Sequence, residues 1–288
     1  MAPIAVEKLN RRAVLAGAGL LLPMPLWAAD GAAAIMALEK ARGLKIGLAA
    51  LDTGSGRTLM HRQNERFVMC STFKMMLSAA VLVKVDRGQE RLDRVIHYKA
   101  SDLLDYAPAA KKNIATGMSI EKLCEAAVEL SDNTCANLLF NVIGGPPALQ
   151  SFVRGLGDTE TRHDRIEGAL NVPDGDKDTT KPAAMIQSMR KILLGDVLKP
   201  ESRAKLAQWM RDCSTGTERI RSGIPKDWQA GDKTGSAFDM LNDIAILWPP
   251  KNRAPILVCC YTTGNKKDDK TTPATWAEIG KIVSATFA

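Results

Sequence analysis

The segment that most constrains the fold runs from Cys70 to Val83. Cys70-Ser71-Thr72-Phe73-Lys74 leads into an almost wholly apolar run, and a helix of that composition has no polar face to present to water. Ser71 and Lys74 are three residues apart, so on a helix they share a face. A buried lysine is costly unless its charge is used or its proton is given up. The pair is therefore a candidate activated nucleophile, in which lysine does what histidine does elsewhere.

The overall composition is that of a globular protein with a small anionic ligand. The 288 residues are 45% hydrophobic, enough for one large domain or two lobes. The net charge is +7, but basic residues occur at most in pairs such as Lys111-Lys112, and aromatic residues make up only 5%. This pattern argues against a nucleic-acid partner and favours a mildly basic pocket.

The first thirty residues resemble an export signal. The twin-arginine pair Arg11-Arg12 precedes the apolar run 13–22, and small residues follow it. We expect cleavage near residues 28–32 and a periplasmic protein. The alternative is a membrane anchor, but Pro23 and Pro25 interrupt a run too short to span a bilayer. No stable membrane association is expected, and we expect a monomer.

The cysteines do not suggest a disulfide framework or a metal site. They are scattered, and Cys259-Cys260 are neighbours on an expected strand, where their side chains point to opposite faces. No spacing suggests zinc, and no metal or cofactor is expected. We predict mostly buried free thiols, with at most one bridge, among Cys70, Cys124, Cys135, Cys213, Cys259 and Cys260.

The order of expected elements is strands, a long helical middle, strands and a final helix. A hairpin is expected over 45–61, with its turn at 52–56. Helices are expected from Ser71, and then over 119–130, 134–141, 147–155, 182–194 and 200–211. Strands are expected over 229–234, 243–248 and 256–262, and a last helix over 273–287.

This order predicts an α+β fold with one five-stranded antiparallel sheet flanked by helices, and an inserted all-helical lobe. Residues 31–66 and 212–288 form the sheet-containing lobe, and residues 67–211 form the helical lobe, with the active site between them. The loop 158–182 has no periodic pattern, and a loop of that length is usually functional. Its charged residues, including Arg165 and Asp178, are expected to tie it down by internal ion pairs.

Two further motifs follow the serine-lysine pair. Ser131-Asp132-Asn133 stands at a sharp break after a helix, where side chains can point into a cleft. Lys233-Thr234-Gly235-Ser236 lies on an expected strand, where glycine permits a ligand to approach the backbone closely. S-x-x-K, S-D-N and K-T-G in this order form the signature shared by class A β-lactamases and penicillin-binding proteins.

A fourth motif separates these two groups. The stretch from Arg165 through Glu167 to Asn171 resembles the R-x-E-x-x-L-N loop of class A β-lactamases, which penicillin-binding proteins lack. The resemblance covers essentially the whole chain after the export segment. It implies a serine β-lactamase that hydrolyses penicillins and cephalosporins without metal or cofactor.

The resemblance also implies a role for each motif residue. Ser71 is the nucleophile, Lys74 and Ser131 relay protons, and Glu167 with Asn171 holds the deacylating water. Either Lys74 or Glu167 can serve as the acylation base. Backbone N–H groups of Ser71 and Ser236 form the oxyanion hole. The substrate is bound by Tyr106 at the cleft mouth, by Asn133 at the side-chain amide, and by Lys233, Thr234 and Ser236 at the carboxylate.

Each of these residues also has a purely structural interpretation. Ser131 and Asn133 can cap the following helix, Glu167 can pair with Arg165 in a surface loop, and Lys233 can be a solvated charge on a sheet edge.

Some positions depart from the family pattern. Leu241-Asn242-Asp243 stands where members often place a carboxylate-binding arginine, and Arg219 is the expected substitute. The partners of two family disulfides are replaced, by Ser78 opposite Cys124 and by Ala237 opposite Cys70. Both bridges should be absent, and broad carbapenem activity is not expected.

Two alternatives remain from the sequence. One is a DD-peptidase acting on cell-wall peptides, and another is a β-lactam-binding sensor that is acylated without turnover. Glu167 with Asn171 argues against both, because both lack a dedicated deacylating base. His61, His97 and His163 match no catalytic position, which argues against a Ser-His-Asp hydrolase.

Overall fold

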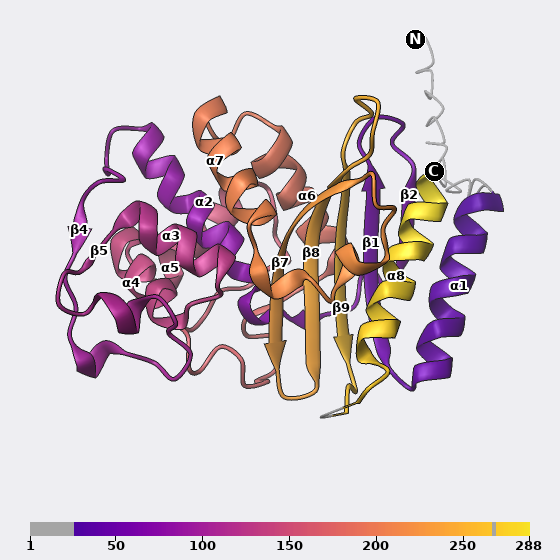
Figure 1. Ribbon diagram of the computed structural model, residues 1–288, viewed down its shortest axis with the longest axis horizontal. Helices are drawn as coiled ribbons and strands as arrows, with labels where there is room; N and C mark the ends of the chain where they lie inside the picture. The colour runs from indigo at the N-terminus through magenta and orange to yellow at the C-terminus, as the bar shows by residue number, and fades with distance from the viewer. Residues whose placement is uncertain (1–25, 267–268) are drawn as a thin grey trace, which may run out of the picture.

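A single antiparallel sheet organises the computed structural model, which describes residues 26–266 and 269–288 (Figure 1). Its strands lie in the order β2 (Thr58–His61), β1 (Lys45–Asp52), β9 (Ile256–Thr263), β8 (Met240–Trp248) and β7 (Gln229–Ala237). The α+β fold with a five-stranded antiparallel sheet is therefore confirmed. β7 is the edge strand next to the turn at residues 70–72 and to the helix over residues 200–211. The K-T-G motif that β7 carries therefore lies beside the helical part of the molecule.

Helices cover both faces of the sheet. One face is covered by α1 (Leu26–Arg42) and α8 (Thr272–Phe287). The other side carries α2 (Phe73–Asp86), α3 (Ile120–Glu129), α4 (Asn133–Ile143), α5 (Pro146–Gly155), α6 (Pro182–Leu194) and α7 (Pro200–Arg211). Two small ribbons complete the fold, β3 (Phe67–Val68) with β6 (Thr179–Thr180) and β4 (Val95–Ile96) with β5 (Met118–Ser119).

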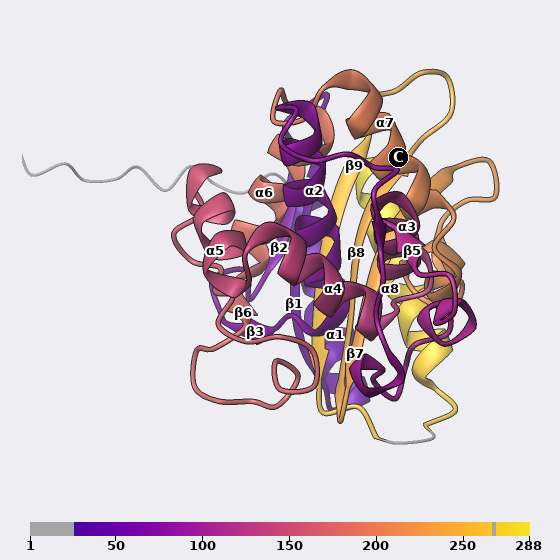
Figure 2. The ribbon, with the colours of Figure 1, turned by 90° about the vertical axis from the view of Figure 1, so that its left-hand side faces the viewer.

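The helix predicted from the opening motif lies at the centre of the larger core. Every side chain of α2 from Phe73 to Val83 is buried. Figure 2 views the molecule from the helical side and shows α2 in front of the sheet, with α4 and α5 beside it. Because α2 touches helices all round, its apolar sequence needs no polar face.

The alternation of side chains along the strands divides the core in two. Cys259 contributes to the core on the α2 side of β9, whereas Cys260 contributes to the core under α1 and α8. The predicted opposite orientation of these neighbours is confirmed. All six cysteines are buried and unpaired.

The element boundaries differ from expectation mainly at strand and chain ends. β7 and β8 meet in a turn at Phe238, so each is three residues longer than expected on that side. The helix α1 was not predicted. The predicted export signal lies outside the described residues up to position 25, and the predicted cleavage region 28–32 falls within α1. No helix in the described parts of the chain is long and apolar enough to cross a membrane.

Candidate active site

The turn that carries Ser71, residues 70–72, is here called the nucleophile turn. Its backbone is strained, and a residue of the sheet holds it in place. Cys70 has φ +46°, in the left-handed region that residues with a side chain rarely adopt. It begins the 3₁₀ turn Cys70–Thr72, which presents Ser71 just before α2. The amide of Asn242 on β8 donates to the carbonyl oxygens of Val68 and Met69, at 2.9 and 3.1 Å. The turn is therefore held against the sheet, and Asn242 is a positioning residue that the sequence did not reveal.

Gly235 of the K-T-G motif allows β7 to approach this turn. A Cβ at position 235 would lie 2.7 Å from the carbonyl oxygen of Met69 and 3.1 Å from the backbone nitrogen of Ser71. The first contact is closer than real Cβ atoms tolerate, the second is tighter than most of them make, and both are with backbone. A ligand was expected to approach the backbone at this glycine, and the structure shows that the nucleophile turn approaches it closely.

Lys74 stands one helical turn from Ser71, as its spacing requires. Its ammonium group donates to Ser71 Oγ at 3.1 Å, to the carbonyl oxygen of Ser131 at 2.8 Å and to Asn133 Oδ1 at 2.6 Å. It also lies 2.9 Å from Glu167 Oε1. Lys74 is fully buried, and the loss of hydration lowers its pKa, while the charge of Glu167 opposes that shift.

Glu167 is buried, and its two oxygens have different partners. Oε1 faces Lys74 and accepts from Ser71 Oγ at 3.4 Å, whereas Oε2 accepts from the amide of Asn171 at 2.9 Å. The backbone of Glu167 is fixed by Asn137 on α4, whose Oδ1 accepts from its N–H at 2.9 Å and whose Nδ2 donates to its carbonyl at 3.3 Å. The interpretation of Glu167 as a partner of Arg165 is therefore wrong. Asn137 is one helical turn from Asn133 on the same face of α4, a spacing that could have revealed it.

Ion pairs and backbone contacts close the loop that carries Glu167. Asp178 is buried and its carboxylate accepts from Arg165 Nε at 2.6 Å and from the N–H groups of Asp164 and Arg165 at 2.9 and 3.0 Å. The carbonyl oxygen of Asp178 accepts from the N–H of Met69 at 3.1 Å, which connects the loop to the nucleophile turn. The predicted Arg165–Asp178 pair is confirmed.

The three residues of the S-D-N motif have different tasks. Ser131 has φ +60°, and its Oγ accepts from Lys233 at 3.1 Å while its carbonyl faces Lys74. Asp132 is the N-cap of α4, where its Oδ1 accepts from the N–H of Cys135 and its Oδ2 accepts from two more N–H groups in the preceding loop. The interpretation of Ser131 or Asn133 as the cap is therefore wrong, and both side chains are left facing Lys74 and Lys233.

Lys233 is fully buried, although it lies on an edge strand. Its ammonium donates to Ser131 Oγ and, at 2.8 Å, to the carbonyl of Thr234. Loss of hydration, with a contribution from the charge of Lys74, lowers the pKa of Lys233 to about 8. The interpretation of Lys233 as a solvated edge charge is wrong.

Arg219 comes from the loop before β7 and reaches the same strand. Its guanidinium donates to Ser236 Oγ at 3.1 Å and lies over the ring of Trp276, 5.1 Å from the ring centre. Thr234 precedes Ser236 by two residues on β7, and its Oγ1 lies 2.5 Å from Thr215 Oγ1. The sequence did not reveal this contact. A cationic side chain is thus present at the end of β7, although β8 supplies none.

The eleven residues singled out from the sequence occupy one region. Tyr106 stands at its rim with 51% of its surface exposed, and its carbonyl accepts from the N–H of Asn133 at 2.9 Å. Three basic side chains, Lys74, Lys233 and Arg219, belong to the region, and the buried carboxylates of Glu167, Asp132, Asp232 and Asp243 interact with them. Basic side chains gathered in one region suit an anionic substrate. Among the described residues, no cluster of His, Cys, Asp or Glu is arranged to hold a metal ion.

This constellation is that of a serine acyl-transfer enzyme whose base is a lysine or a glutamate. A nucleophile, a buried amine and a carboxylate lie within hydrogen-bonding reach of one another.

Comparison with known proteins identifies the family. The model of the β-lactamase enzyme family matches residues 31–287. β-Lactamase L2 of Stenotrophomonas maltophilia is 44% identical over 85% of this chain and 82% of its own, and β-lactamase AST-1 of Nocardia asteroides is 42% identical over 85% and 80%. The solved structure of an ancestral (GNCA) class A β-lactamase is 49% identical, with a TM-score of 0.86 over 89% of this chain and 100% of the other. The chain belongs to the class A β-lactamases, and it is a serine β-lactamase.

Proposed function

We propose that this enzyme hydrolyses the β-lactam ring of penicillins and cephalosporins through an acyl-enzyme on Ser71, with Glu167 activating the deacylating water. The observation that carries the proposal is the meeting of Ser71 Oγ, Lys74 Nζ and Glu167 Oε1, with separations of 2.9–3.4 Å. Such a geometry allows a proton to leave the serine and to return to a leaving group.

In the acylation step Ser71 Oγ attacks the lactam carbonyl and transfers its proton to the Lys74–Glu167 pair. Burial lowers the pKa of Lys74, which favours its neutral form, and Glu167 Oε1 already accepts from Ser71 Oγ. The ring C–N bond breaks, and the ring nitrogen takes a proton through Ser131. The hydroxyl of Ser131 suits that role because it accepts from Lys233 and is free to donate toward the substrate.

The charge on the carbonyl oxygen is stabilised by backbone N–H groups of Ser71 and Ser236. Gly235 supports this assignment, because it is what lets β7 lie against the nucleophile turn. Two preorganised donors of this type commonly lower such a barrier by several kcal/mol, at about 3 kcal/mol per donor.

In the deacylation step a water attacks the ester carbonyl while Glu167 accepts its proton. Asn171 holds Glu167 Oε2, and Asn137 holds the Glu167 backbone, so the carboxylate has one orientation. A base fixed in this way contributes roughly 10²–10⁴ in rate. This second half of the reaction is what distinguishes a hydrolase from a protein that is only acylated.

The substrate carboxylate is bound by Lys233, Thr234, Ser236 and Arg219, whose contacts with one another line the β7 edge. The side-chain amide of the substrate lies against Asn133, and Tyr106 covers the mouth of the site. Arg219 replaces the arginine that β8 lacks, and its contact with Ser236 Oγ supports that role.

We also infer that the chain is exported by the twin-arginine route and cleaved near residues 28–32 to give a periplasmic monomer. The pair Arg11-Arg12 supports the route. Replacing both arginines with lysine should leave the activity in the cytoplasmic fraction, and unchanged periplasmic activity would refute this route.

Steady-state turnover of a chromogenic cephalosporin tests the proposed reaction. The proposal predicts many product equivalents per enzyme. A single stoichiometric burst would instead indicate a binding sensor, and release of D-alanine from a cell-wall peptide with no β-lactam turnover would indicate a DD-peptidase.

A further inference from the structure

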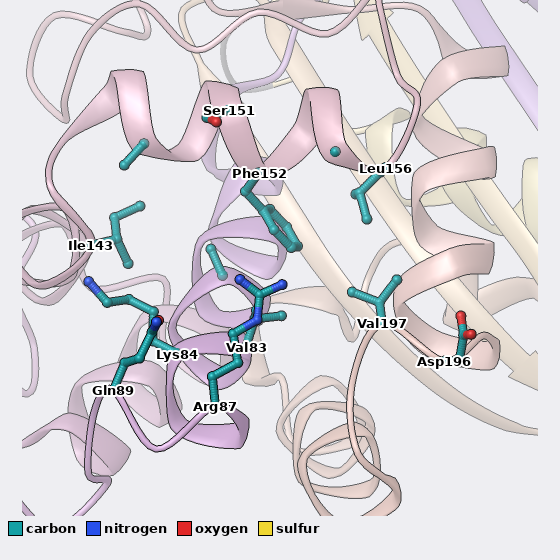
Figure 3. A pocket seen from close by; sticks show the side chains of 13 residues that line it. Val83, Lys84, Arg87, Gln89, Ile143, Ser151, Phe152, Leu156, Asp196 and Val197 are labelled. Carbon is teal, nitrogen blue, oxygen red and sulfur yellow. The ribbon is translucent and has the colours of Figure 1, made fainter.

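A cavity lies at the other end of α2 from the nucleophile. It has a volume of about 620 Å³ and is bordered by the last turn of α2, the end of α4, helix α5 and the segment between α6 and α7 (Figure 3). Val83 on its floor follows Lys74 by nine residues, which is roughly 13 Å along a helix. None of the residues that line it belongs to the proposed active site.

The walls of this cavity are mixed, with slightly more apolar than polar surface. Val83, Ile143, Phe152, Leu156 and Val197 line it, and the Phe152 ring points into its centre (Figure 3). The cavity volume lies within the range typical of small-molecule sites, roughly 300–1,000 Å³.

The charged groups of the cavity are separated into two ends. Lys84 and Arg87 lie at the α2 end, whereas Asp196 lies beyond Val197 (Figure 3). The Lys84 ammonium donates to the carbonyl of Val142 at 3.2 Å, which leaves two of its three donors free. The Arg87 guanidinium makes no hydrogen bond or ion pair with any residue of the described parts of the chain. The charge of Glu90 interacts with Lys84, whereas Arg87 is a cationic donor at the border of this cavity that forms no ion pair with any described residue.

We propose that this cavity binds a small amphipathic carboxylate. The carboxylate would take the free donors of Arg87 and Lys84, and an alkyl or aryl body would lie between Phe152 and Val83. An apolar body alone would leave Arg87 without an anion. A cationic ligand would be repelled at the α2 end, and only the exposed Asp196 would attract it.

Octanoate is a suitable probe, because it has one carboxylate and an eight-carbon chain. In two-dimensional NMR of the full chain it should bind saturably with a Kd on the order of 1 mM or tighter. The shifted amides should belong to residues 83–89, 148–156 and 196–197. Shifts that cluster around Ser71 and Lys233, or no saturable binding in this range, would overturn the proposal.

Matched variants test the role of charge. Arg87→Glu should weaken octanoate binding, because it replaces an attractive charge with a repulsive one. The expected loss is only about tenfold, since solvent screens exposed charges. Arg190→Glu is the control, because Arg190 is exposed on α6 and does not line the cavity. Equal loss in both variants would mean unspecific attraction of the anion, and would refute the site.

Two further comparisons test the remaining parts of the proposal. The neutral analogue 1-octanol should bind about tenfold more weakly than octanoate, and equal binding would refute the carboxylate assignment. Ala148→Trp should abolish octanoate binding by filling the cavity, and unchanged binding would refute the location. Turnover of a chromogenic cephalosporin should be unchanged in Arg87→Glu, which shows that this variant is folded.

Discussion

Removing the carboxylate of Asp178 should open the loop that carries Glu167 while the rest of the fold stays closed. Asp178 is buried, and its carboxylate accepts from Arg165 Nε and from two backbone N–H groups. In the Asp178→Ala variant the three donors lose their acceptor together. Breaking a buried ion pair by removing one partner costs about 3–5 kcal/mol.

The lower end of that range applies here. The side chain of Arg165 is 21% exposed, so water can replace part of what it loses. A loss of about 3 kcal/mol corresponds to roughly a hundredfold rise in the open fraction of the loop. Glu167 would leave its place against Lys74 in the open state, so deacylation should slow and acyl-enzyme should accumulate.

Hydrogen exchange followed by mass spectrometry measures this opening directly. Amides of residues 164–179 should exchange roughly a hundredfold faster in Asp178→Ala, whereas those of β8 should be unchanged. Asp174→Ala is the matched control, because Asp174 is an exposed carboxylate of the same loop that pairs with Lys177 at 2.7 Å and reaches Arg165 only at 3.9 Å. Unchanged exchange in Asp178→Ala, or an equal rise in the control, would refute the account of how the loop is held.

Three other predictions concern the β7 side of the site. Burial lowers the pKa of Lys233 to about 8, so its charge is lost as pH rises through that value, and kcat/KM for an anionic β-lactam should fall there. A flat pH profile would contradict this, and Lys233→Arg should move the falling limb to higher pH. Arg219→Ala should raise KM about tenfold with a smaller change in kcat, and an unchanged KM would refute its role at the carboxylate. Gly235→Ala places a Cβ 2.7 Å from the carbonyl oxygen of Met69, so it should lower kcat and destabilise the fold by about 1–3 kcal/mol in thermal unfolding. Wild-type values of both would show that β7 need not lie so close.

Much of the fold could be predicted because local patterns and tertiary contacts agree. A helix was expected over 119–130, and at its start the side chain of Ser119 accepts from the N–H of Lys122 as the N-cap of α3. The apolar run after Lys74 specified a helix buried on all sides, and α2 is one. The helix α1 was missed, because its alanine-rich sequence follows directly on a segment that resembles an export signal.

The candidate site was predicted as a set of motifs, and its residues lie together. What the motifs could not provide is the contacts between distant segments. Asn242 holds the backbone before Ser71 from a strand more than 170 positions away, and Asn137 holds Glu167 from α4. An asparagine has no pattern of its own in a sequence, since its role depends on which backbone groups the fold brings to it. Asp132 is the cap of α4, although Ser131 and Asn133 were considered as caps. The sequence could not distinguish the three, because the choice depends on which backbone groups the fold brings near each side chain.

Trapping the acyl-enzyme in Glu167→Gln tests the central claim most directly. The variant keeps Ser71 and Lys74 but lacks the carboxylate that activates water. After mixing with a penicillin, intact mass spectrometry should show one acyl adduct per chain, mapped to the peptide that contains Ser71, with deacylation slowed roughly 10²–10⁴-fold. Wild-type turnover without an adduct, or an adduct on another residue, would contradict the account.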